Sequence, residues 1–108
     1  MDMDFNDVKR EVIQFTEDRN WDQFHTPENL AKSISIEAAE LLECFQWNAN
    51  YDKDAVAEEL ADVMNYCILM ADKIGINIEE AIVSKIRKNS EKYPIEKSYG
   101  SSKKYTEL

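Results

Sequence analysis

The sequence predicts an all-α protein folded as a four-helix up-down bundle. Only two glycines and two prolines occur in 108 residues, which excludes the many turns of a β-sandwich and the glycine loops of a P-loop or Rossmann fold. Apolar residues instead recur at helical spacing in four stretches separated by short polar linkers. Helices joined by short connections pack as antiparallel neighbours around one core.

The first helix is predicted over residues 4–19, with acidic residues just before it that can cap its N-terminus. A loop over residues 20–25 follows. Thr26 and Pro27 then indicate the start of the second helix, because threonine supplies a capping acceptor and proline at the first position loses no needed N–H. This helix is predicted to end near Trp47.

The third helix follows a polar linker over residues 48–52 and is predicted to stop at Gly75. Its apolar surface is wider than a surface helix needs, which indicates a core that continues across a subunit interface. Asn77 is predicted to cap the fourth helix, which Pro94 ends.

The charge is unevenly distributed along the chain. The net charge of −9 argues against a nucleic-acid polymer as the main partner. Seven of the 13 lysines and arginines fall in residues 85–108, where they either neutralise the acidic body or meet a small anion such as phosphate. The interpretation is a helical domain over residues 1–97 and a basic, polar, mobile tail over 98–108.

A membrane location is not expected. The N-terminus is acidic where a signal peptide would be basic, and no apolar run approaches the roughly 18 residues of a membrane span. The sequence therefore predicts a soluble, cytoplasmic protein.

Two carboxylate pairs of the same spacing are the candidate metal-binding or catalytic residues. Glu37 and Glu40 lie on the second predicted helix, Glu59 and Asp62 on the third, and each pair is flanked by apolar residues. Residues three apart share one helical face, so antiparallel neighbours would bring all four carboxylates together. Such a cluster takes up protons or binds a hard cation, Mg²⁺ first and Mn²⁺ second. The alternative is an ordinary solvated acidic face.

A magnesium site inside a helical bundle indicates phosphate chemistry, because Mg²⁺ shares its ligands with substrate phosphates. A di-iron site of the ferritin type needs a Glu-x-x-His motif on two helices. His25, the sole histidine, lies in a predicted loop, which excludes that site. We interpret His25 as a loop anchor or as a partner of the start of the second helix.

The motifs Glu37-x-x-Glu40 and Glu59-x-x-Asp62, separated by 18 residues, resemble the signature of the MazG-like all-α nucleoside triphosphate pyrophosphohydrolases. Further segments resemble the dCTP pyrophosphatase branch of that family, and the resemblance spans residues 5–108. These segments are Trp21–His25, Pro27, Asn29-Leu30, Phe45–Trp47, Lys85, Lys88-Asn89, Tyr93-Pro94 and Lys104–Leu108.

The resemblance implies Mg²⁺-dependent hydrolysis of dCTP or a related pyrimidine triphosphate to the monophosphate and pyrophosphate, a nucleotide-pool sanitation activity. It also implies a homodimer or homotetramer whose sites combine residues of several subunits. The implied metal ligands are Glu37, Glu40, Glu59 and Asp62, with Glu37 or Glu40 acting on the attacking water. The implied substrate contacts are Trp21, Trp47 and Tyr66.

Several basic or polar residues near the C-terminus are candidates to bind phosphates. Lys85, Lys88 and Asn89 can hold the β and γ phosphates, and Lys103 or Lys104 can close over the site. For each lysine, an ordinary solvated surface position is the alternative.

One residue departs from the pattern of the family, and two alternative functions follow. Mammalian relatives in this branch place a substrate-contacting histidine where this chain has Val12, so the preference for cytosine is in doubt. Hydrolysis of dUTP or of modified triphosphates is the first alternative. A non-catalytic acidic bundle that binds a basic partner is the second, and stabilisation by Mg²⁺ with a nucleotide would argue against it.

Overall fold

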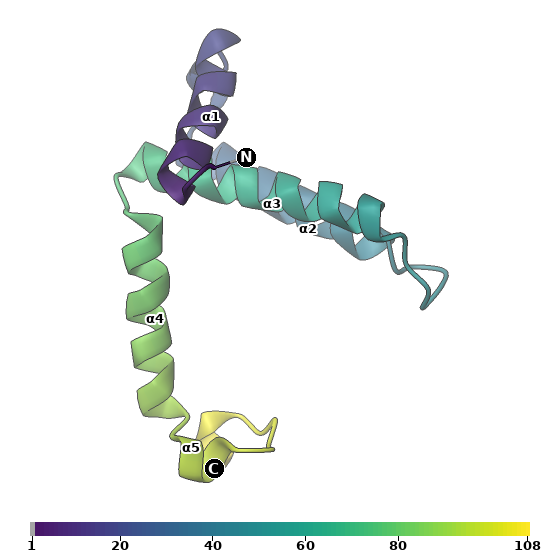
Figure 1. Cartoon of the computed structure of the whole chain (residues 1–108), viewed down its shortest axis with the longest axis vertical. Helices are drawn as coiled ribbons and strands as arrows, with labels where there is room; N and C mark the ends of the chain where they lie inside the picture. Colours follow the sequence, from purple (N-terminus) through teal and green to yellow (C-terminus); the bar gives the residue numbers. More distant parts are fainter. Residues whose placement is uncertain (1) are drawn as a thin grey trace. The chain divides into compact units, whose positions relative to one another are not determined.

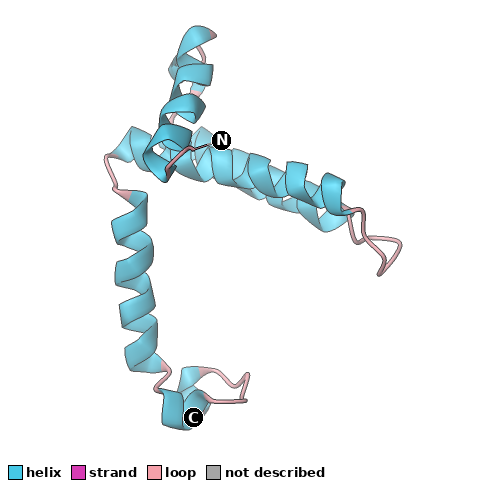
Figure 2. Ribbon diagram, in the orientation of Figure 1, coloured by secondary structure: helices cyan, strands magenta, loops and turns pink. Residues whose placement is uncertain are grey.

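The computed structural model describes residues 2–108 and is all-α, with no strand within that range (Figure 2). The predicted all-α class is therefore confirmed, and the packing of four helices as an up-down bundle stays a prediction. The chain divides into two compact units, one ending at Ile76 and the other covering Asn77–Leu108. Its elements are α1 (Phe5–Asp18), η1 (Asp22–Phe24), α2 (Pro27–Glu43), α3 (Lys53–Ile74), α4 (Ile78–Lys92), α5 (Ile95–Ser98) and η2 (Tyr105–Glu107).

The first unit is built on the pair α2 and α3, which lie side by side and antiparallel, with α1 packed against α3 (Figure 1). Leu30 near the start of α2 is fully buried, and Ile68, Leu69 and Ala71 in the second half of α3 are buried. Since the helices are antiparallel, these positions meet at one end of the pair. The core of this unit therefore lies at that end, and the carboxylate motifs lie nearer the middle.

The ends of α1 and α3 follow the predicted signals. Asp4 accepts the backbone N–H of Asp7, and the Asp7 carboxylate accepts that of Asp4 in return. Asp52 caps α3 by accepting the N–H of Asp54. Gly75 ends α3 with φ of 75°, a left-handed conformation that suits glycine. No helix within residues 2–108 has the length and apolarity to cross a membrane.

The second helix ends earlier than predicted. Thr26 caps α2 as expected, but the helix stops at Glu43, so the predicted end near Trp47 is wrong. The next three N–H groups bond to carbonyls three positions earlier, at 3.0 to 3.2 Å, which tightens the last turn. The ring of Phe45 then packs on that of Tyr51 at 5.2 Å between centroids. This contact between residues on either side of the turn favours an early reversal over a longer helix.

The second unit contains α4, capped by Asn77 as predicted. The chain after α4 forms two short helical segments, α5 and η2. The ring of Tyr105 packs edge-to-face on that of Tyr93 at 5.9 Å, and the Lys92 ammonium lies 4.9 Å from the centre of the Tyr105 ring. These contacts hold η2 against the end of α4. The division between a domain over 1–97 and a tail over 98–108 stays a prediction.

Candidate active site

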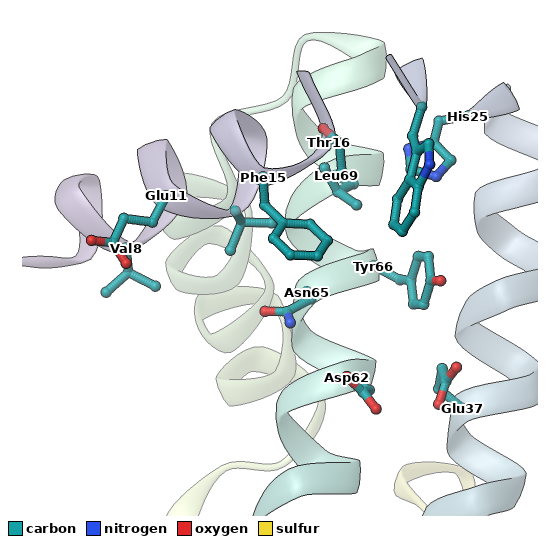
Figure 3. Close-up of a pocket in the computed structure, with 12 residues that line it drawn as sticks. Val8, Glu11, Phe15, Thr16, His25, Glu37, Asp62, Asn65, Tyr66 and Leu69 are labelled. Atoms are coloured by element: carbon teal, nitrogen blue, oxygen red, sulfur yellow. The ribbon is translucent and has the colours of Figure 1, made fainter. Parts of the chain in front are cut away.

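The carboxylates of the two predicted motifs gather between α2 and α3. One carboxylate oxygen each from Glu37, Glu40 and Glu59 lies within 4.8 Å of the other two. Glu37 and Asp62 face each other from the two helices (Figure 3). Oxygens bound to one Mg²⁺ at about 2.1 Å are roughly 3 to 4 Å apart, so small side-chain movements bring the three oxygens to ligand distances.

Two buried oxygens of this cluster have no hydrogen-bond partner among residues 2–108. They are Oε2 of Glu37 and Oε2 of Glu59. Burial raises the pKa of Glu37 from 4.5 to about 7, and the neighbouring carboxyl of Glu40 adds to this rise. The charges of Asp62 and Glu59 act in the same direction. Burial, followed by Glu40 and Asp62, also raises the pKa of Glu59. A buried cluster of this kind binds protons or a cation.

A pocket of about 630 Å³ adjoins the cluster, within the range of small-molecule sites. Glu37 and Asp62 line it, so the cluster and the pocket form one continuous site. Tyr66 of α3 lies beyond them in the view, with Phe15 of α1 opposite (Figure 3). The remaining lining residues are Val8, Glu11, Val12, Thr16, Trp21, His25, Asn65 and Leu69.

The loop that carries Trp21 is fixed from both sides. The backbone N–H of Trp21 donates to the backbone carbonyl of Thr16 at 3.0 Å. The Trp21 ring packs edge-to-face on that of Phe15, with 5.6 Å between the ring centroids. The next residue, Asp22, forms an ion pair with Lys73 of α3 at 2.7 Å. The tryptophan is thus held in place at the pocket rather than carried on a free loop.

Of the predicted substrate contacts in the first unit, two line the pocket and one does not. Trp21 and Tyr66 line the pocket, whereas Trp47 does not and is 88% exposed in the turn after α2. Lys85, Lys88 and Asn89 are exposed on α4, in the second unit. The catalytic, metal and substrate roles assigned to all these residues stay predictions.

Sequence reasoning missed part of the pocket. His25, interpreted as a loop anchor, lies edge-on to Tyr66 with ring centroids 6.4 Å apart and lines the pocket. Asn65 was not singled out, although it lies three residues after Asp62 and the same spacing rule would have found it. Glu11 and Thr16 line the pocket only because α1 packs against α3. No local sequence pattern indicates this packing.

The raised pKa of Glu37 predicts how pH affects the stability of the metal-free protein. Because the fold binds this proton more tightly than the unfolded chain does, the stabilisation is fully present below pH 4.5 and is lost as pH rises to about 7. We therefore expect the melting temperature, followed by circular dichroism with a chelator present, to fall between pH 5 and 7.5. Added Mg²⁺ should reverse the fall at pH 7.5.

Glu37→Gln is the matched variant for this measurement, because glutamine keeps the size of the side chain and cannot ionise. Its melting temperature should change less with pH than that of the wild type. If the melting temperatures of the two proteins changed equally with pH, Glu37 would not be the group responsible.

The chain is similar to several known proteins. Two curated relatives, dCTP pyrophosphatase 1 of Mus musculus and of Homo sapiens, are each 35% identical over 112 residues, covering 94% of this chain and 66% of theirs. The chain thus spans slightly less than two thirds of the length of these relatives. The crystal structure of a pyrophosphatase from Archaeoglobus fulgidus matches with a TM-score of 0.78 and 41% identity, covering 87% of this chain and 95% of that one.

The sequence also matches the MazG-like family over residues 32–108, a range that includes both carboxylate motifs. The chain belongs to the MazG-like family and is a homologue of nucleoside triphosphate pyrophosphatases.

Proposed function

We propose that the protein hydrolyses a deoxynucleoside triphosphate, dCTP or a related pyrimidine, to the monophosphate and pyrophosphate. The observation that carries this proposal is the carboxylate cluster with two unpartnered buried oxygens at one end of an aromatic-lined pocket. A triphosphate needs cationic charge, and a nucleoside needs a partly apolar cavity. The carboxylate cluster can bind the cation, and the adjoining pocket can bind the nucleoside.

The cation that fits this donor set is Mg²⁺, with Mn²⁺ as a substitute, because all donors are carboxylate oxygens. Glu37, Glu40, Glu59 and Asp62 would hold it. When bound, Mg²⁺ supplies positive charge to the phosphates and increases the acidity of water.

The chain's own residues supply the remaining steps. Glu37 or Glu40 orients the attacking water and takes up its proton, as a positioned carboxylate can do. The water oxygen bonds to the α-phosphorus, and the bond to the oxygen bridging the α and β phosphates breaks. Pyrophosphate is then released.

Substrate binding is assigned to the aromatic residues of the pocket and to α4. Trp21, fixed beside Phe15, offers a flat surface on which a base stacks. Tyr66 lies one turn from Asp62, within reach of the sugar or the α-phosphate. The β and γ phosphates are assigned to the exposed polar residues of α4, namely Lys85, Lys88 and Asn89.

We also propose that the active form is a homodimer or homotetramer. Large apolar side chains of the first unit are exposed in the single chain: Leu42 by 70%, Phe24 by 60% and Ile36 by 59%. Exposed apolar surface is stabilised when a second copy covers it. The exposed Leu60 on α3 adds to the same argument.

A panel of nucleoside triphosphates, scored for pyrophosphate release with and without Mg²⁺, tests the proposal. We expect the highest kcat/KM for dCTP or another pyrimidine deoxynucleotide. The panel includes dUTP and methylated or oxidised triphosphates, because the α1 wall of the pocket carries Val12, which cannot hydrogen-bond a base. Release of orthophosphate instead, or no release from any triphosphate, would refute the proposal.

A further inference from the structure

A neutral side-chain amide lies in the pocket next to the carboxylate cluster. Asn65 is on α3, three residues after Asp62, and lines the pocket (Figure 3). Its amide has no hydrogen-bond partner within residues 2–108. The group is therefore free to bind a ligand.

On the α1 wall of the pocket, the polar side chains are engaged or lie at its edge. The Thr16 hydroxyl donates to the Ile13 carbonyl at 2.8 Å and is buried. In the close-up, Glu11 lies on the far side of Phe15 from Tyr66 (Figure 3). The rest of the α1 wall is apolar and offers no hydrogen bond. If Asn65 loses its amide, no neighbouring side chain of this wall replaces it.

The position of Asn65 along α3 indicates which part of a nucleotide it meets. A helix rises about 1.5 Å per residue, so Asn65 lies roughly 4.5 Å along the axis from Asp62, and Leu69 roughly 10 Å. With the α-phosphate at the carboxylates, the sugar comes next and the base lies farther away. Asn65 is thus level with the sugar and Leu69 with the base.

We propose that the Asn65 amide binds the 3′-hydroxyl of the deoxynucleotide sugar and thereby sets the sugar preference of the site. The proposal rests on the function proposed above. A carboxamide carries both a donor and an acceptor, which match the two hydrogen-bonding roles of a hydroxyl. Asn65 thus selects the sugar, while Trp21 binds the base.

The test compares sugar forms of the triphosphate that the substrate panel ranks first. We measure kcat/KM for the deoxynucleotide, the 2′,3′-dideoxynucleotide and the ribonucleotide, with wild type and with Asn65→Leu. The wild type should prefer the deoxynucleotide to the 2′,3′-dideoxynucleotide by roughly tenfold, as expected for one neutral hydrogen bond, and Asn65→Leu should bring this ratio close to one. The dideoxy form reports on the 3′-hydroxyl and the ribo form on the 2′-hydroxyl.

Matched variants separate recognition from folding. Asn6→Leu makes the same change at an exposed position of α1 outside the pocket, and it should keep the wild-type ratio. If Asn65→Leu melts early, Asn65→Ala takes its place. As a readout besides turnover, the rise in melting temperature caused by non-hydrolysable α,β-methylene analogues should show the same loss of sugar discrimination.

The outcomes are distinguishable. Wild-type hydrolysis with an unchanged sugar ratio in the Asn65 variants would overturn this inference alone. Equal use of all three sugar forms by the wild type would also overturn it. Absence of pyrophosphate release from every triphosphate would refute the proposed function and this inference with it.

Discussion

Replacing Glu40 by Gln should reduce triphosphate hydrolysis by about 10²- to 10⁴-fold while leaving the helices folded. Glu40 belongs to the cluster of three carboxylates and raises the pKa of both Glu37 and Glu59. Glutamine keeps its size but removes one negative charge and the ability to accept a proton. Pyrophosphate release at saturating Mg²⁺ measures the loss, and circular dichroism checks the fold.

Glu43→Gln is the matched control, because Glu43 is exposed on the same helix, one turn farther along and outside the cluster. It should retain wild-type turnover. Since the Glu40 variant also removes a repulsive charge from a partly buried cluster, its metal-free form should melt at or above the wild-type temperature. Undiminished Mg²⁺-dependent turnover in Glu40→Gln would remove Glu40 from the site.

Local signals were sufficient to predict most of the helices. Caps such as Asp4, Thr26 and Asn77 and the stop at Gly75 act through hydrogen bonds or backbone conformation within a few residues. Such interactions can be read from the sequence alone. The predicted helix starts and the stop at Gly75 agree with the structure for this reason.

The sequence is least informative where contacts between distant residues decide the conformation. The end of α2 depends on the packing of Phe45 on Tyr51 across the linker. The C-terminal segment is held by Tyr105 on Tyr93, twelve residues apart, although its composition is that of a solvated tail. No periodic pattern encodes either contact.

The same distinction applies to the site. The gathering of the carboxylates followed from their three-residue spacing and from the antiparallel arrangement of α2 and α3. The pocket, by contrast, is completed by α1 and by the loop that carries Trp21 and His25. Its shape results from how these segments pack, so a spacing rule could not supply it.

Replacing Trp47 by Ala should lower kcat/KM by about 5- to 150-fold, because stacking on one base contributes roughly 1 to 3 kcal/mol. The resemblance to the family implies that this side chain contacts substrate, yet within one chain it is 88% exposed and away from the pocket. Both statements hold if Trp47 completes the pocket of a second copy. Steady-state kinetics of Trp47→Ala, with Phe45 and Tyr51 left intact, measures the effect.

Subunit mixing then shows whether Trp47 acts in the site of another chain. In a dimer formed from Glu40→Gln and Trp47→Ala chains, one of the two sites keeps both native residues. A statistical mixture should therefore recover about a quarter of the wild-type activity, above the average of the separate variants. Glu40→Gln mixed with Trp21→Ala should show no recovery, because Trp21 and the carboxylates belong to one chain's pocket. Equal behaviour of the two mixtures would place Trp47 in its own chain's site or outside any site.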